Sequence, residues 1–256
     1  VRDHPEVTDV LLSGGDSLIL PTTRLRKVIQ EIREINHVGI IRIGTKMLAY
    51  NPFRITEDPD LIDLIKEASG GEKKIYIMAH FNHPNEISPE SIRAIRMLQK
   101  AGAIIVNQTP VIDGVNNDPV VMADLFKRLS FMGVSPYYVF QCRPTIGNLI
   151  YSVPVEESFR TLQNAFKMCS GLAKRARFIM SHSTGKIEVV GMNNHNSFMR
   201  YHQAADPDDY EKFMISHSNP QARWFDDYEP FTPGTGPIRE WLFEHDPAAY
   251  SGTAIN

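Results

Sequence analysis

Glycines and an acid directly follow an apolar run near the start of the sequence, and together they could bind a small ligand. The run 9–13 leads into Gly14, Gly15 and Asp16. Two glycines let the backbone approach a ligand closely and leave its amide groups unobstructed. The Asp16 carboxylate can accept a hydrogen bond from a ligand amine, or it can cap a following helix. The sequence alone leaves both roles of Asp16 open.

Two histidines and one lysine are the other candidates for chemistry. His80 and His83 lie in the segment HFNHP at a spacing that could hold a metal, but an extended chain does not point both side chains in the same direction well, and Pro84 forces a bend. We therefore expect one histidine to contact a ligand, and we expect no metal site. Lys186 lies where a tight turn enters a strand, so it is either a solvated surface residue or the amine of a Schiff base.

The elements that would position these residues are short apolar strands alternating with longer amphipathic segments. This alternation is typical of an α/β fold with a parallel sheet buried on both faces. Five of the apolar runs become polar at their C-terminal ends, in SGGD, GTK, HFNHP, NQT and QCR. In a parallel α/β barrel such ends share one face, which carries the active site. The predicted strands are 9–13, 38–44, 74–81, 103–109, 136–142, 177–181 and 186–191.

Helical spacing of apolar residues predicts amphipathic helices between these strands, at 22–35, 88–102, 118–133 and 154–172. The second begins with Ser88 before Pro89 and ends at Gly102, which are good start and stop signals. After residue 191 the composition changes to Asn, His, Asp, Pro and Tyr. We therefore predict a barrel over 1–191 and an irregular C-terminal extension over 192–256, in which Trp224 and Trp241 have no assigned role.

Composition excludes several classes of protein. The 256 residues are 42% hydrophobic and 22% charged with a formal net charge of -3, so nucleic acid is not an expected partner. No apolar run reaches the ~18 residues of a membrane span. Cys142 and Cys169 are the only cysteines, which argues against a disulfide framework and for a reducing, cytoplasmic location.

Five segments in unbroken order resemble the lysine 2,3-aminomutase family of radical S-adenosylmethionine (SAM) enzymes. They are VLLSGGDSL, RIGTK, HFNHPNEIS, NQTPVIDGVNND and PYYVFQC, within residues 7–191. The resemblance implies a partial TIM-like (βα)6 barrel that works with a [4Fe-4S] cluster, SAM and pyridoxal phosphate (PLP). It implies an isomerase in which a 5′-deoxyadenosyl radical moves the amino group of an amino acid held on PLP as an aldimine. It also implies a reductant such as flavodoxin or ferredoxin, and family members often form homo-oligomers.

The resemblance carries several roles onto residues of this sequence. The glycine-rich turn is expected to bind the methionine end of SAM, and Lys186 matches the PLP lysine, which would be the catalytic residue. Arg54, in FRIT, is a further candidate near the cofactor. The expected cofactor-binding residues are Ser13, Gly14, Gly15, Asp16, Arg54, His80, Gln108 and Lys186.

Several departures from the family pattern limit what is carried over. The family's CxxxCxxC motif would lie before Val1, so we expect the N-terminus to be missing and the chain to be inactive without that cluster-binding segment. The family's DAPGGGGK is SHSTGK here, and Phe140 replaces a tyrosine. Asp118 stands where the family has a structural zinc cysteine, so zinc is not expected.

The most informative departures concern the substrate. In lysine-specific members two aspartates hold the side-chain ammonium of lysine, and the matching residues here are Arg143 and Ser181. An arginine repels an ammonium and can bind a carboxylate. The substrate is therefore expected to be an acidic or neutral amino acid such as glutamate, unless Arg143 only pairs with a nearby acid. Two other functions stay open: a radical SAM enzyme without PLP, and a non-redox barrel that binds a small molecule.

Overall fold

The strands form one sheet in which sequence neighbours are also neighbours in space. The computed structural model describes residues 1–210 and 212–229, and within them the strand order is β1 to β9 without a crossover. Strands β1 to β6 pair in parallel, and β6 to β9 pair antiparallel. The strands are β1 (Asp9–Leu12), β2 (Ile40–Thr45), β3 (Lys74–Ala79), β4 (Ile104–Pro110), β5 (Ser135–Phe140), β6 (Arg177–His182), β7 (Gly185–Met192), β8 (Asn196–Ala204) and β9 (Phe213–His217).

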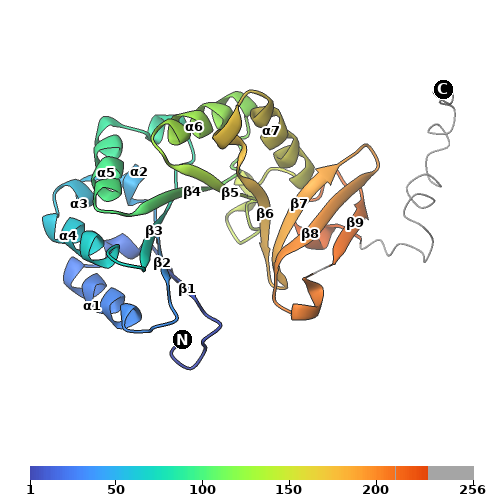
Figure 1. The fold of residues 1–256 in the computed structure, drawn as a ribbon. Helices are drawn as coiled ribbons and strands as arrows, with labels where there is room; N and C mark the ends of the chain where they lie inside the picture. Colours follow the sequence, from blue (N-terminus) through green and yellow to red (C-terminus); the bar gives the residue numbers. More distant parts are fainter. Residues whose placement is uncertain (211, 230–256) are drawn as a thin grey trace, which may run out of the picture.

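Helices cover the outer side of the sheet, which curves as Figure 1 shows. They are α1 (Thr22–Arg33), α2 (Met47–Tyr50), α3 (Phe53–Thr56), α4 (Pro59–Ala68), α5 (Pro89–Lys100), α6 (Pro119–Phe131) and α7 (Val155–Lys167).

The two faces of the sheet differ because side chains alternate along each strand. In β2, Ile41 and Ile43 belong to the buried core, whereas Ile40 and Arg42 line a cavity of about 200 Å³. Apolar burial against the helices therefore stabilises one face, and the other face is left to line cavities.

The predicted strands and helices are confirmed to within a few residues. The start signal of α5 is also confirmed, because the Ser88 side chain accepts a hydrogen bond from the backbone N–H of Ser91. The prediction missed α2, α3 and α4. Helix α4 nevertheless carries a clear start signal, since Asp58 caps it by accepting from the Leu61 N–H and Pro59 follows.

The closed outline of a barrel is not confirmed. Strands β1 and β9 are the two edges of the described sheet, which stays open. The six parallel strands and outer helices agree with the α/β class of the predicted barrel. No helix in the described ranges is both long enough and apolar enough to cross a membrane.

The prediction of an irregular extension was wrong for its first part. Residues 192–229 include β8 and β9, which continue the sheet from β7. Trp224 is buried in the main core, whereas Trp241 lies outside the described residues. The division of the chain at residue 191 stays a prediction, and one sheet runs through that position.

Candidate active site

A cavity of about 370 Å³ lies at the carboxyl ends of β1 to β5. The polar strand ends were predicted to meet on one face, and this cavity brings several of them together. Four of the predicted cofactor-binding residues line it, together with Lys46 and Phe140. These four are Gly15, Asp16, His80 and Gln108.

Asp16 holds the loop after β1 against the end of β2. Its Oδ1 accepts from the Leu18 N–H at 3.0 Å and from the Thr45 hydroxyl at 2.7 Å, and its Oδ2 accepts from the Lys46 N–H at 2.6 Å. Of the two roles left open by the sequence, the structure shows the cap, over the short helix Ser17–Ile19. The carboxylate therefore shapes the cavity wall with most of its acceptor capacity already used.

Gly14 and Gly15 have the backbone conformation that the glycine-rich turn requires. Their φ angles are +97° and +98°, which side chains rarely adopt. A Cβ built on either residue meets nothing within 4 Å. The protein therefore leaves open space beside this turn, at the cavity, where a ligand can approach the backbone.

His80 presents a buried ring nitrogen beside the cavity. Its Nε2 is buried and makes no hydrogen bond with the described residues. Burial, and then the nearby Lys46 ammonium, lowers the pKa of His80, so the ring is neutral at pH 7. The Lys46 Nζ donates to the His80 carbonyl at 3.2 Å and to Glu86 Oε1 at 2.9 Å.

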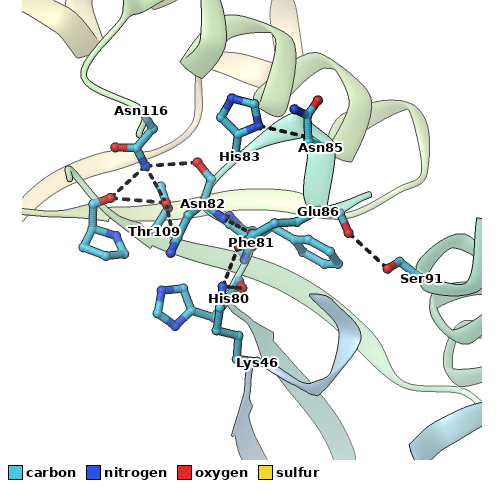
Figure 2. A network of polar contacts seen from close by, with 12 residues as sticks. Lys46, His80, Phe81, Asn82, His83, Asn85, Glu86, Ser91, Thr109 and Asn116 are labelled. Atoms are coloured by element: carbon cyan, nitrogen blue, oxygen red, sulfur yellow. Dashed lines mark hydrogen bonds and ion pairs between the residues drawn. The ribbon is translucent and has the colours of Figure 1, made fainter. Parts of the chain in front are cut away.

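Buried asparagine side chains near the ends of β3 and β4 form hydrogen bonds with backbone groups of these segments (Figure 2). The Asn116 amide donates to the Asn82 carbonyl at 3.0 Å and to the Pro110 carbonyl at 2.9 Å. Asn107 accepts from the Phe81 N–H at 2.8 Å and donates back to the Phe81 carbonyl at 3.1 Å. These bonds fix the strand ends that carry His80 and Gln108.

His83 has a structural role in this arrangement. Its Nδ1 accepts from the Asn85 N–H at 3.1 Å and so caps the short helix Pro84–Glu86 (Figure 2). The described residues contain no group of three or more histidine, cysteine or acidic side chains arranged to hold a metal. Burial raises the pKa of the Cys142 and Cys169 thiols.

Lys186 lines a second cavity, of about 290 Å³, together with Ser181. The two residues are register partners on β6 and β7. The Lys186 Nζ lies 5.2 Å from the centroid of the Tyr138 ring. Burial, and then the Arg42 guanidinium, lowers the pKa of Lys186, which raises the fraction of the nucleophilic free amine at neutral pH.

The other predicted site residues lie apart from both cavities. Arg54 donates to the carbonyls of Leu18 and Leu20 and to Asp58, so it joins the loop after β1 to α4. Ser13 is exposed and lines neither cavity. Arg143 is exposed, and within the described ranges it has no hydrogen bond or ion pair.

Sequence reasoning did not single out Lys46, Asn116 or Tyr138 as site residues. Lys46 had a signal, because it ends the polar segment GTK after a predicted strand. The other two lie inside the quoted segments NQTPVIDGVNND and PYYVFQC, but their contacts with Asn82 and Lys186 join residues far apart in the sequence.

Comparison with known proteins finds relatives that share much of this sequence. A protein of Aquifex aeolicus, described as "Putative L-lysine 2,3-aminomutase", is 50% identical over 230 residues, which are 89% of this chain and 61% of that protein. The chain belongs to the lysine 2,3-aminomutase family. The L-lysine 2,3-aminomutase of Clostridium subterminale is 38% identical over 171 residues, which are 67% of this chain and 40% of that enzyme.

A family member with a different named substrate is also similar. The glutamate 2,3-aminomutase of Clostridioides difficile is 35% identical over 173 residues, which are 68% of this chain and 40% of that enzyme. The chain thus spans between two fifths and about three fifths of the length of these relatives. No protein-family model matches the chain.

Proposed function

We propose that this chain forms the SAM- and amino-acid-binding part of a radical SAM aminomutase. The observation that carries the proposal is the cavity at the strand ends, where Gly15, Asp16, His80 and Gln108 meet. These are positions that the resemblance assigns to SAM. Their convergence from β1, β3 and β4 supports the assignment, because the residues are far apart in the sequence.

The residues at the two cavities fit SAM and PLP. Open space beside Gly14 and Gly15 leaves room for a ligand against the backbone, and His80 Nε2 is a buried polar atom with no hydrogen-bond partner among the residues that the structure describes. The half-buried Lys186 supplies an amine that could hold PLP through its carbonyl carbon. Cys142 and Cys169 do not make up the ligand set of a [4Fe-4S] cluster, so we assign no part of a cluster to this chain.

The chain's own contribution is binding, orientation and exclusion of water. When bound, SAM would supply a carbon radical that abstracts hydrogen, and PLP would supply the carbonyl that holds the amino acid. Asp16 keeps the glycine turn open by tying it to β2. The neutral His80 would contact SAM without adding another positive charge to the sulfonium and the Lys46 ammonium. The buried amide network keeps His80 and Gln108 at fixed positions.

The substrate proposed is an acidic or neutral amino acid rather than lysine. Arg143 stands where lysine-specific members have an aspartate, and it lacks an acidic partner among the described residues. The ion-pair alternative for Arg143 therefore has no support from the described contacts. A guanidinium can bind a substrate carboxylate through two parallel hydrogen bonds. The similarity to a glutamate 2,3-aminomutase supports the same substrate class.

Binding of SAM to the chain tests the cavity directly. Isothermal titration calorimetry is expected to detect SAM binding that Gly15→Ala weakens at least ~10-fold, about 1.4 kcal/mol, because the methyl group would occupy the open space. Gly71→Ala is the matched control, since Gly71 also has a positive φ of +72° and open space, but it lies outside the cavity. Equal weakening by the two variants would contradict the proposed position of SAM.

Turnover tests the reaction and the substrate class. A preparation that also contains a CxxxCxxC segment and a verified [4Fe-4S] cluster is reduced under anaerobic conditions, with flavodoxin or ferredoxin as the donor. Formation of 5′-deoxyadenosine from SAM is expected to rise with glutamate more than with lysine. A faster reaction with lysine would refute the substrate argument, and no product with any amino acid would favour a barrel that only binds a small molecule.

A further inference from the structure

The Tyr138 ring, which lies beside the Lys186 amine, is itself contacted by a residue of β8, three strands further along the sheet. Tyr138, on β5, is buried, and its hydroxyl lies 2.6 Å from Nε2 of His202, on β8. The two rings meet edge to face, with centroids 5.5 Å apart and an interplanar angle of 80°. His202 in turn lies 2.8 Å from Arg177 Nη1, at the start of β6, through its Nδ1. Residues of β5, β6 and β8 thus form one chain of contacts that ends at Lys186.

The chemistry of Arg177 decides which nitrogen of His202 carries the proton. A guanidinium can only donate hydrogen bonds, so His202 Nδ1 must accept and cannot carry a proton. The imidazole is therefore neutral, with its proton on Nε2, and it donates to the Tyr138 oxygen. Burial, and then the charge of Arg177, lowers the pKa of His202, which agrees with the neutral form.

The neutral form of His202 matters because Lys186 and His202 lie among several arginines. A protonated His202 would add another cation to a region that already contains several. The Glu188 carboxylate is used by Arg200, which donates to it at 2.8 and 3.0 Å. The charged and titratable groups that surround Lys186 and His202 are Asp9, Arg42, Tyr138, Arg177, Glu188 and Arg200.

We infer that His202, held by Arg177 as a neutral hydrogen-bond donor, is a positioning residue that fixes the Tyr138 ring beside the Lys186 amine. The inference deepens the proposed function and rests on it, because it concerns the lysine proposed to hold PLP. It assigns a role to β8, in the segment that follows the residues carrying the family resemblance.

The physical effect is on the environment of the amine. A fixed Tyr138 ring covers the Lys186 side chain and contributes to the burial that favours the free amine. When the bond from His202 is lost, the Tyr138 ring is held by packing alone, and water reaches the Lys186 ammonium more easily. Better solvation favours the charged form, so the amine becomes less nucleophilic at a given pH.

The test measures the reactivity of Lys186 in the 256-residue chain. Reductive methylation is followed by mass spectrometry from pH 7 to 10, and Lys186 is compared with the exposed Lys66 in the same sample. His202→Phe keeps a ring but removes both hydrogen bonds. His202→Gln is the conservative variant, because an amide oxygen can accept from Arg177 while its NH₂ donates to Tyr138. Thermal melting verifies that each variant is folded.

His202→Phe is expected to lower Lys186 labelling relative to Lys66 by ~5-fold at pH 8, and to shift the midpoint of its pH profile upward by about 0.7. His202→Gln is expected to stay within ~2-fold of the unmodified chain, as rescue by restored hydrogen bonds requires. Unchanged labelling in His202→Phe would overturn the inference, and so would an equal loss in both variants. If His202→Phe does not fold, Tyr138→Phe removes only the accepting oxygen and is expected to reduce labelling in the same direction.

A second measurement separates this inference from the proposed function. PLP is added, the adduct is trapped with borohydride, and the modified residue is mapped. If the unmodified chain carries no PLP on Lys186, the PLP part of the proposed function fails, and the methylation ratios still decide the role of His202. If PLP is on Lys186 in all variants at equal rates and methylation is also unchanged, the function stands and the positioning role is refuted.

Discussion

Glu156 offers the sharpest test of how residues 192–229 are joined to the helical side of the protein. Its carboxylate lies on α7 and is almost fully buried, at 1% exposed. It accepts from the Ser218 hydroxyl at 2.9 and 3.0 Å and from the Asn219 N–H at 2.7 Å, both just beyond β9. It also accepts from Arg160 at 3.0 Å, within α7.

The magnitude follows from what each substitution leaves unpaired. Glu156→Ala removes the acceptor of both groups beyond β9, and breaking a buried charged network costs about 3–5 kcal/mol. Arg160 is 57% exposed, so its ion pair adds little. Glu156→Gln keeps the volume and one oxygen for the Asn219 N–H, so we expect a loss of about 1–2 kcal/mol.

Urea unfolding measures these losses, and the exposed Glu157 on the same helix provides the control. Glu157→Ala is expected to change the free energy of unfolding by less than about 0.5 kcal/mol. Hydrogen exchange at the β8 and β9 amides is expected to accelerate in Glu156→Ala, because those strands lose their tie to α7. A Glu156→Ala loss below about 1 kcal/mol would refute the idea that this carboxylate holds the segment in place.

Three further outcomes follow from the site. Gly15→Ala is expected to cost about 1–2 kcal/mol in a melting or urea experiment from backbone strain alone, since no neighbour lies within 4 Å of the added carbon; a loss above about 4 kcal/mol would mean that the space is not open. Asn116→Asp puts an acceptor against the carbonyls of Asn82 and Pro110 and is expected to lower stability by about 2–4 kcal/mol, whereas Asn85→Asp on the surface serves as the control. Burial, and then Lys46, lowers the pKa of His80, so the His80 ring of the unfolded chain takes up a proton more readily than that of the folded chain. The free energy of unfolding is therefore expected to fall as the pH drops below about 6.5. An unchanged dependence of this free energy on pH in His80→Gln would show that His80 is not the cause.

Much of the secondary structure could be predicted because local patterns and the final environment agree. In α5, the apolar spacing, the Ser88 cap and Gly102 all indicate the same bounds, and the helix forms there. The short helices α2 and α3 have too few residues to show a period, so their apolar side chains carried no readable signal. Strand β8 was missed for another reason: it contains Asn, His and Gln, and it becomes a strand because β7 and β9 pair with it.

For the candidate site, the sequence predicts which residues converge but does not predict what each of them does. Parallel strands place their carboxyl ends at one edge, so the convergence of Gly15, His80 and Gln108 was predictable from the order of the apolar runs. The role of Asp16 was not, because a cap and a ligand contact require the same residue type. Its three hydrogen bonds, two of them to residues at the end of β2, show the cap, and the contact of Asp16 with SAM stays a proposal.

The sequence by itself determined the α/β class, the positions of the main strands and helices, the motifs of the family and the candidate lysine. These depend on local periodicity, on glycine and proline, and on short segments whose order is preserved. The tertiary structure alone decided that the sheet stays open, that residues beyond 191 extend it, and that His202 reaches Tyr138 beside Lys186. Such contacts join residues up to 64 positions apart, so their free energy depends on the folded arrangement and leaves no signal in either local segment.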